Sequence, residues 1–145
     1  MSGQLKIAGY ASLFSRRDGA GDCVEPGAFR MSLRQRPASK VAMLWQHDPA
    51  IPIGRWTRLV ETSFGLWVEG YLAPGVLKAR EAAHLISEGA SNGLSIGFKA
   101  KKAHRDLRSA ERCLKQIDLW EISLVTFPQV EEARVRLLPA AQRRR

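Results

Sequence analysis

A serine with few large neighbours stands in the segment SNGLSIGFK, residues 91–99. On a strand, alternation places Ser95 and Gly97 on one face and three large apolar residues on the other. The apolar face would hold the strand in a core, and the glycine would leave space beside the hydroxyl for another side chain and a substrate. Ser95 is therefore a candidate nucleophile, and a small strand residue without a chemical role is the alternative interpretation.

Two other apolar segments carry groups that can activate a hydroxyl. His47 ends the segment VAMLWQH, where it would be partly desolvated yet reachable, and the pKa range of histidine suits a general base near neutral pH. Glu121 interrupts the apolar run DLWEISLVTF, where a carboxylate is costly unless it is paired, and a histidine is a suitable partner. A serine activated by a histidine that an acid orients is an arrangement for nucleophilic catalysis.

Other residues compete for these roles. Ser91 is the rival nucleophile, although SNG is more typical of a turn after a helix. Asp118 is the rival acid, but alternation directs it to the face opposite Glu121. His84 lies off the apolar stripe of its predicted helix and His104 lies in a charged segment, so we expect both to be exposed.

The elements that would position these residues are mostly strands. Apolar runs between turn signals predict strands at residues 5–14, 40–47, 55–62, 64–72, 94–102, 113–127 and 133–138. Helices are predicted at 26–36 and 74–90, each opening near a proline, and the segment DPAIPIG, 48–54, is predicted to be a loop. Alternation places Trp120 on the same face as Ile122 and Leu124. The pattern favours a mostly β, α+β domain of barrel type over a parallel doubly wound sheet.

The chain has 145 residues, 45% of them apolar, which suits one domain with a single core. We expect that domain at residues 1–138 and a disordered basic tail at 139–145. Cys23 and Cys113 are far apart in the sequence and show no metal-ligand spacing, so we expect two thiols in a reducing compartment, with a disulfide unsupported. No cofactor motif, metal motif, signal peptide or membrane-spanning run is visible, which predicts a soluble intracellular protein.

The net charge is +9, and the isoelectric point is near 10.3. This charge permits nonspecific contact with nucleic acid or attraction to an acidic protein partner. A basic barrel that binds nucleic acid is therefore an alternative to an enzyme. Against it, most aromatic residues lie in apolar segments rather than among Lys and Arg, and stacking on bases needs exposed rings.

Six segments follow one another in an order that is specific: GYASLF, CVEPGAF, LWQHDP, GLWVEGYL, GLSIGF and DLWEISLVTFP. Within residues 5–128 they resemble the prohead proteases of tailed phages, which are capsid-maturation serine proteases related in fold to the herpesvirus assemblins. A short version in gene transfer agents, which are domesticated phage particles, would show the same segments. The resemblance implies a closed or nearly closed β-barrel with about two main helices packed on it.

The resemblance also implies roles for single residues. It makes the serine of GLSIGF, Ser95, the nucleophile, the histidine of LWQHDP, His47, the general base, and the glutamate of LWEISLVT, Glu121, the acid, with Asp118 as the alternative acid. It implies an endopeptidase that cleaves the major capsid protein, scaffold segments and itself inside the immature capsid in the bacterial cytoplasm, and that self-associates. An inactive capsid-assembly factor on the same fold is the alternative if Ser95 and His47 lie too far apart to share a proton.

Overall fold

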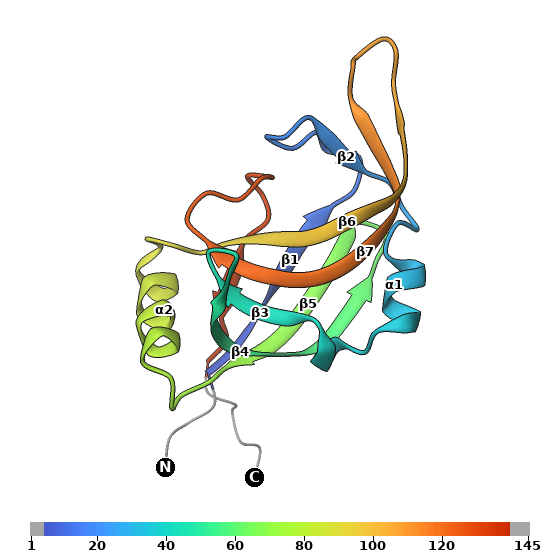
Figure 1. Ribbon diagram of the computed structural model, residues 1–145. Helices are drawn as coiled ribbons and strands as arrows, with labels where there is room; N and C mark the ends of the chain where they lie inside the picture. The colour runs from blue at the N-terminus through green and yellow to red at the C-terminus, as the bar shows by residue number, and fades with distance from the viewer. Residues whose placement is uncertain (1–4, 140–145) are drawn as a thin grey trace.

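A computed structural model describes residues 5–139, in which strands form a curled sheet and two helices lie outside it (Figure 1). The strands are β1 (Leu5–Leu13), β2 (Asp22–Val24), β3 (Ala42–Trp45), β4 (Asp48–Glu61), β5 (Gly65–Leu72), β6 (Gly93–Arg105), β7 (Arg112–Val125) and β8 (Val135–Leu137). The helices are α1 (Arg30–Gln35) and α2 (Leu77–Glu88), and a 3₁₀ turn, η1, covers Ala38–Lys40.

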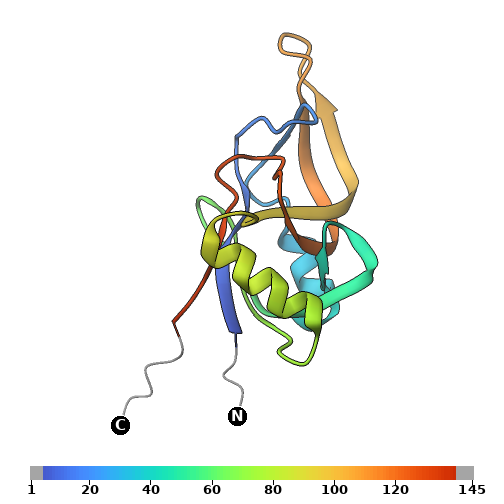
Figure 2. The ribbon, with the colours of Figure 1, turned by 90° about the vertical axis from the view of Figure 1, so that its left-hand side faces the viewer.

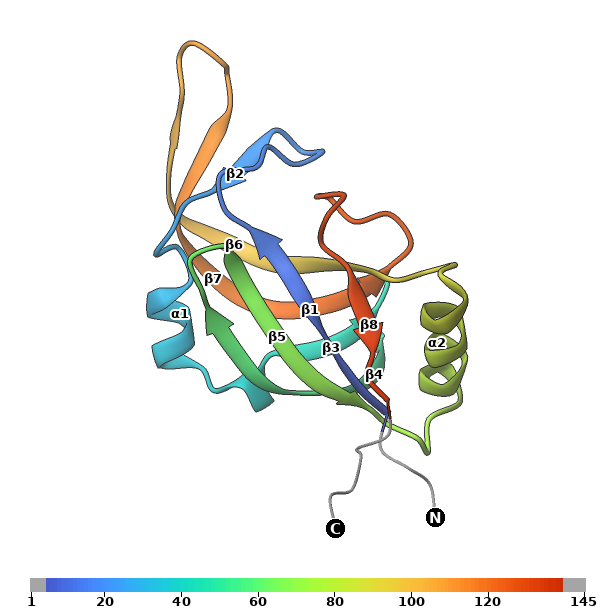
Figure 3. The same ribbon diagram turned by 180° about the vertical axis from the view of Figure 1, so that it is seen from behind.

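The sheet has the strand order β2-β7-β3-β4-β5-β1-β8, and β6 pairs with β7. It curls into a half-barrel, with β1, β5 and β8 side by side when the molecule is seen from behind (Figure 3). The start of β6 meets the segment before β8 at one isolated bridge, Gly93 with Arg134, and β6 then follows β7 into a projecting hairpin. The sheet is therefore a half-barrel that is not fully closed, which corrects the expectation of a closed or nearly closed barrel. The mostly β, α+β class with two helices is confirmed.

Strand β7 pairs with three other strands. It runs parallel to β2 near its N-terminal end, parallel to β3 along its C-terminal part, and antiparallel to β6 along its length. Segments that are far apart in the sequence therefore meet on β7. Parallel neighbours cannot be joined by a tight turn, and the chain between β2 and β7 contains β3 to β6 and both helices.

The core gathers apolar side chains from the sheet and from both ends of the chain. Its largest fully buried members include Trp56, Phe29, Met43, Leu72 and Leu119. Helix α2 lies against one side of the sheet, near β8, β4 and β5 (Figure 2). The residues that α2 buries recur at helical spacing: Ala79, Ala82, Ala83 and Ile86. The helix is shorter at both ends than the predicted range 74–90, and Gly89, whose φ of 75° is left-handed, forms its C-terminal cap.

The first helix is shorter than the predicted range 26–36. Gly27 has a φ of 92°, which lies in the left-handed region and is incompatible with a right-handed helical turn. The main-chain N–H groups of Gly27 and Phe29 donate to the carboxylate of Glu61 on β4, at 2.7 and 3.0 Å. Because these groups are satisfied from another strand, residues 26–29 form turns and α1 begins at Arg30.

The segment 48–54, predicted as a loop from its two prolines, is instead the first half of β4. The pairing of β3 with β4 is irregular there, with register shifts on both sides of the pair formed by Leu44 and Pro52. An irregular ladder tolerates residues without an N–H, so proline does not prevent strand formation at this position.

The predicted alternation fails at Trp120, because β7 contains a bulge there. Gly97 pairs with Glu121 and Phe98 pairs with Leu119, so Trp120 is an extra residue on its strand. Its side chain is 48% exposed, whereas the apolar residues that follow on β7 are buried. A bulge interrupts the alternation of faces, which the sequence pattern alone does not reveal.

No helix among residues 5–139 is long and apolar enough to cross a membrane. Cys23 and Cys113 are both free. Apart from residue 139, the predicted basic tail lies outside the described residues.

We predict that Leu119→Ala lowers the free energy of unfolding by about 2–5 kcal/mol, because it leaves a cavity where a side chain is fully buried. Leu107→Ala is the matched control: its side chain is 96% exposed, and a surface change of this kind alters stability by less than about 0.5 kcal/mol. Denaturant unfolding of both variants beside the wild type measures the difference. Equal losses would contradict the packing described for β7.

Candidate active site

The chain reverses between β3 and β4 in a two-residue turn. Trp45 pairs with Asp48, and the residues between them, Gln46 and His47, have φ values of 52° and 61°. Positive φ at both central positions is required by a type I′ hairpin turn, and glycine or asparagine usually meets that requirement. The expectation that His47 ends a strand is therefore corrected: β3 ends at Trp45, and the turn carries His47.

Contacts from β7 hold this unfavourable turn in place. The main-chain N–H of His47 donates to Oγ of Ser123 at 3.0 Å, and the Ser123 hydroxyl donates to Oε1 of Glu121 at 2.6 Å. The other oxygen of that carboxylate, Oε2, is hydrogen-bonded to Nδ1 of His47. A further hydrogen bond runs from Nε2 of Gln46 to Oγ1 of Thr126 at 2.9 Å. The position of the imidazole is therefore fixed through both its main chain and its ring.

Ser95 lies on the strand next to these contacts. In the antiparallel β6–β7 pair, Ser95 is directly opposite Ser123, and Gly97 is directly opposite Glu121. Directly opposed residues project from the same face of a sheet. Ser95 therefore shares a face with the carboxylate that contacts His47, and its side chain is largely buried there.

Gly97 makes room for the acid of this site. A Cβ atom at position 97 would overlap Oε2 of Glu121, the atom that contacts His47. Any larger residue at this position would displace the carboxylate from the imidazole. The space that the sequence predicted beside Ser95 is therefore partly occupied by Glu121.

Electrostatics favour the protonated form of His47. The hydrogen bond to Glu121 raises the pKa of His47 above its ordinary value of 6.5, partial burial opposes this rise, and the negative charge of Glu121 adds to it. The two side chains differ in exposure, with 42% for His47 and 15% for Glu121. The imidazole can therefore exchange protons with a substrate while the carboxylate stays shielded behind it.

The rival residues lie elsewhere. Asp118 pairs with Arg36 at 3.1 Å rather than with His47. Ser91 lies in the turn after α2, is buried, and shares a hydrogen bond with Oγ1 of Thr126 at 3.2 Å. His84 and His104 are exposed on α2 and β6, as predicted.

Sequence reasoning missed the role of Ser123. Alternation placed this residue on the face of Glu121, but nothing in the sequence shows that its hydroxyl reaches the main chain of His47. That contact depends on the parallel register of β3 with β7, in which Leu44 is opposite Ser123, and on the tight turn that follows β3. The only signal in the sequence is that Ser123 lies two residues after Glu121, and this signal is weak.

Comparison with known proteins gives this arrangement its context. The pattern of one protein family matches residues 1–144, and that family is described as caudovirus prohead serine protease. The chain belongs to this family. The prohead protease of Enterobacteria phage HK97 is 39% identical over 127 residues, which make up 86% of this chain and 56% of that protein.

Two further relatives of this chain come from other phages. The prohead protease of Escherichia phage T5 is 32% identical over 127 residues, covering 87% of this chain and 59% of that protein. The capsid polyprotein of Pseudomonas phage PAJU2 is 34% identical over 143 residues, covering 94% of this chain and 20% of that protein. The chain spans less than two thirds of the length of each of these relatives.

Solved structures with the same fold come from herpesviruses. The KSHV protease in complex with a hexapeptide phosphonate inhibitor superposes with a TM-score of 0.62 at 12% identity, covering 91% of this chain and 63% of that one. The varicella-zoster virus protease gives a TM-score of 0.55 at 16% identity, with 91% and 63% covered. At these identities the likeness establishes the fold alone, and it confirms the expected similarity in fold to the herpesvirus proteases.

We predict that an NMR titration of His47 gives a pKa above 6.5 and that Glu121→Gln lowers it, because the substitution removes the carboxylate behind the imidazole. Since the pKa is raised in the folded state, the pair stabilises the fold fully below pH 6.5, and this contribution is lost as pH rises through the folded-state pKa. Resonances of His84 serve as the internal control, because that residue lies on α2 and not in the turn between β3 and β4 that contacts Glu121. A His47 pKa that does not respond to Glu121→Gln would contradict the contact.

Proposed function

We propose that the chain is the peptidase domain, residues 1–138, of a prohead maturation protease. In this serine endopeptidase Ser95 is the nucleophile, His47 is the general base, and Glu121 is the acid that orients the base. The observation that carries the proposal is the contact between Nδ1 of His47 and Glu121, on the face of β7 that Ser95 shares from β6. A serine, a histidine and an acid gathered in this way support acyl transfer.

The proposed reaction is peptide-bond hydrolysis through an acyl-enzyme. Because Glu121 occupies Nδ1 of His47, Nε2 is the nitrogen that exchanges a proton with Ser95. Oγ of Ser95 attacks the scissile carbonyl carbon while its proton passes to His47, which then protonates the leaving amine as the peptide bond breaks. A water that gives its proton to His47 attacks the resulting ester, and the acid product leaves as Ser95 regains its proton. In both steps Glu121 stabilises the transient imidazolium.

The substrates we propose are the major capsid protein and scaffold segments of an immature phage-like shell, together with the enzyme itself. Two relatives are named prohead proteases and a third is named a capsid polyprotein, which supports a substrate among capsid proteins. The net charge of +9 favours an acidic scaffold segment. Cleavage would take place inside the shell, within the bacterial cytoplasm, in a phage or in a gene transfer agent.

We predict that Ser95→Ala stops processing of the cognate capsid protein on co-expression, with a loss of at least about 10⁴-fold in rate, because the nucleophile is gone. Ser91→Ala, four residues away, is the matched control and should process at nearly the wild-type rate. Mass spectrometry of the new capsid-protein terminus measures the cleavage. Processing that survives Ser95→Ala would remove the nucleophile assignment, and a capsid protein left intact by the wild-type enzyme would remove the proposed substrate.

We predict that Ser123→Ala lowers kcat/KM by about 10–100-fold, because a hydrogen bond to a charged group contributes about 1.5–3 kcal/mol. Ser32→Ala is the matched control, since its buried hydroxyl accepts the main-chain N–H of Leu119, also on β7, at 2.9 Å. Both variants lose a buried hydrogen bond, but only Ser123→Ala should displace the pH–rate profile. Identical kinetics and pH profiles in the two variants would show that Ser123 has no role in positioning the base and the acid.

A further inference from the structure

A second cluster of reactive side chains lies near the N-terminal end of β7. Cys23 on β2 is paired with Cys113 on β7, and Cys113 is paired with His104 on β6. Paired residues on neighbouring strands project from the same face, so the three side chains form one row across three strands. Their spacing in the sequence indicated no metal site, because the row exists only through the parallel pairing of β2 with β7.

Carboxylates complete this row. The ligand atoms of Cys23, Cys113 and Glu111 lie within 4.8 Å of one another, and so do those of Cys113, His104 and Glu25. Cys113 belongs to both sets, so its sulfur is the point at which they meet. Glu25 is already paired with a lysine at 3.3 Å, and we therefore assign the carboxylate of Glu111 to the cluster.

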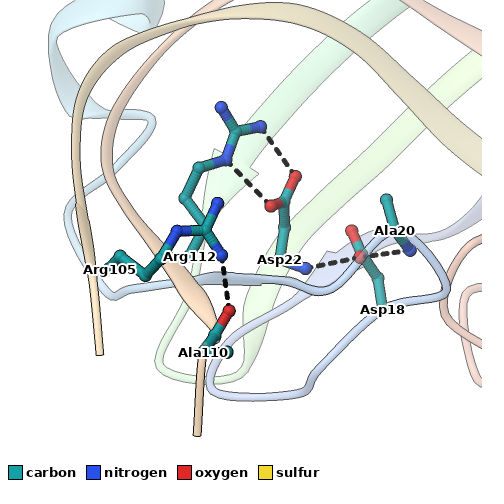
Figure 4. Close-up of polar contacts among 6 residues, drawn as sticks. All are labelled: Asp18, Ala20, Asp22, Arg105, Ala110 and Arg112. Atoms are coloured by element: carbon teal, nitrogen blue, oxygen red, sulfur yellow. Dashed lines mark hydrogen bonds and ion pairs between the residues drawn. The ribbon is translucent and has the colours of Figure 1, made fainter. Parts of the chain in front are cut away.

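The strands that carry the row are fixed by the neighbouring residues (Figure 4). Arg112 holds Asp22 through two hydrogen bonds of 2.9 Å, which tie β2 to β7 one residue before the cysteines. Asp18 accepts the main-chain N–H of Asp22 at 2.9 Å, and Nη1 of Arg105 donates to the carbonyl of Ala110 at 2.5 Å. Alternation directs the Arg112–Asp22 pair and the cysteines to opposite faces, so the ion pair braces the backbone without occupying the cluster.

We propose that Cys23, Cys113, His104 and Glu111 bind one divalent transition-metal ion, and that zinc is the ion they fit. Two thiolates, an imidazole and a carboxylate are all donors that zinc accepts in tetrahedral sites. Tetrahedral zinc needs its donors roughly 3.3–3.8 Å apart. The ligand atoms of Cys23, Cys113 and Glu111 lie within 4.8 Å of one another and have to close by about 1 Å, whereas His104 is grouped only with Cys113 and Glu25, so its exposed side chain has to move further to complete the set. The gathered carboxylates repel thiolates, and a divalent cation removes that repulsion.

Four protein ligands leave no open position, so the site is structural rather than catalytic. The ion would join β2 to both strands of the β6–β7 hairpin. The metal site lies near the N-terminal end of β7, whereas Glu121 and Ser123 lie near the C-terminal end of the same strand. Metal binding therefore does not depend on the proposed peptidase chemistry.

The test uses the untagged chain, stripped with a chelator in the presence of a phosphine reductant and then titrated with zinc chloride. We expect one zinc ion per chain by elemental analysis and a rise in Tm on zinc addition. Cys113→Ser removes the ligand common to both sets and should weaken zinc binding more than about 100-fold, which exceeds the effect of losing a residue that only supports a ligand. His104→Ala should also weaken binding, and His84→Ala, an exposed histidine on α2, is the matched control.

Cobalt chloride provides a readout that needs no variant. Cobalt bound by both cysteines should show strong thiolate-to-metal charge-transfer absorption, which zinc then displaces. A reduced wild-type chain that takes up no zinc, or Cys113→Ser that binds zinc as tightly as the wild type, overturns the proposal. If Cys113→Ser does not fold, a wild-type cobalt spectrum without thiolate absorption overturns it instead.

Discussion

The hydroxyl of Ser123 is the contact on which the candidate site depends. It accepts the main-chain N–H of His47 and donates to Glu121, so one group fixes both the turn that carries the imidazole and the carboxylate that contacts it. Positive φ at a residue with a Cβ costs about 1–3 kcal/mol, and a single hydrogen bond contributes a similar amount. One bond therefore does not hold the turn alone. The contact of the imidazole with Glu121 and the hydrogen bond of Gln46 to Thr126 add what is needed.

Strand β7 explains how these groups come together. Its C-terminal part has β3 on one side and β6 on the other, so the turn after β3 and the serine of β6 approach the same two residues of β7. The bulge at Trp120 sets this register. Phe98 pairs with Leu119, and because Trp120 is skipped, the preceding residue of β6, Gly97, pairs with Glu121. Gly97 then leaves the space that the carboxylate fills. At its N-terminal end, β7 pairs in parallel with β2, and this pairing brings Cys23 and Cys113 together.

Local patterns in the sequence were sufficient to predict most strands, helix α2 and histidine as the partner of Glu121. They were insufficient wherever the outcome depended on pairing between distant segments. The prolines of 48–54 indicated a loop, but an irregular ladder with β3 accepts them. Pro26 indicated a helix start, but Glu61 binds the N–H groups that would have begun it. The roles of Ser123 and of the cysteine row required the parallel registers of β7, and no periodicity within a single segment encodes a register.

The position of β7 in the chain has a consequence for the order in which the protein can be completed during synthesis. Its three strand partners, β2, β3 and β6, all precede it in the sequence. Until Glu121 and Ser123 have left the ribosome, the turn that holds His47 has no anchor, and the imidazole has no counter-ion. A nascent chain that already contains His47 and Ser95 therefore still lacks the contacts that orient the imidazole, and the proposed triad can form only after β7 has been synthesised and paired with β3 and β6.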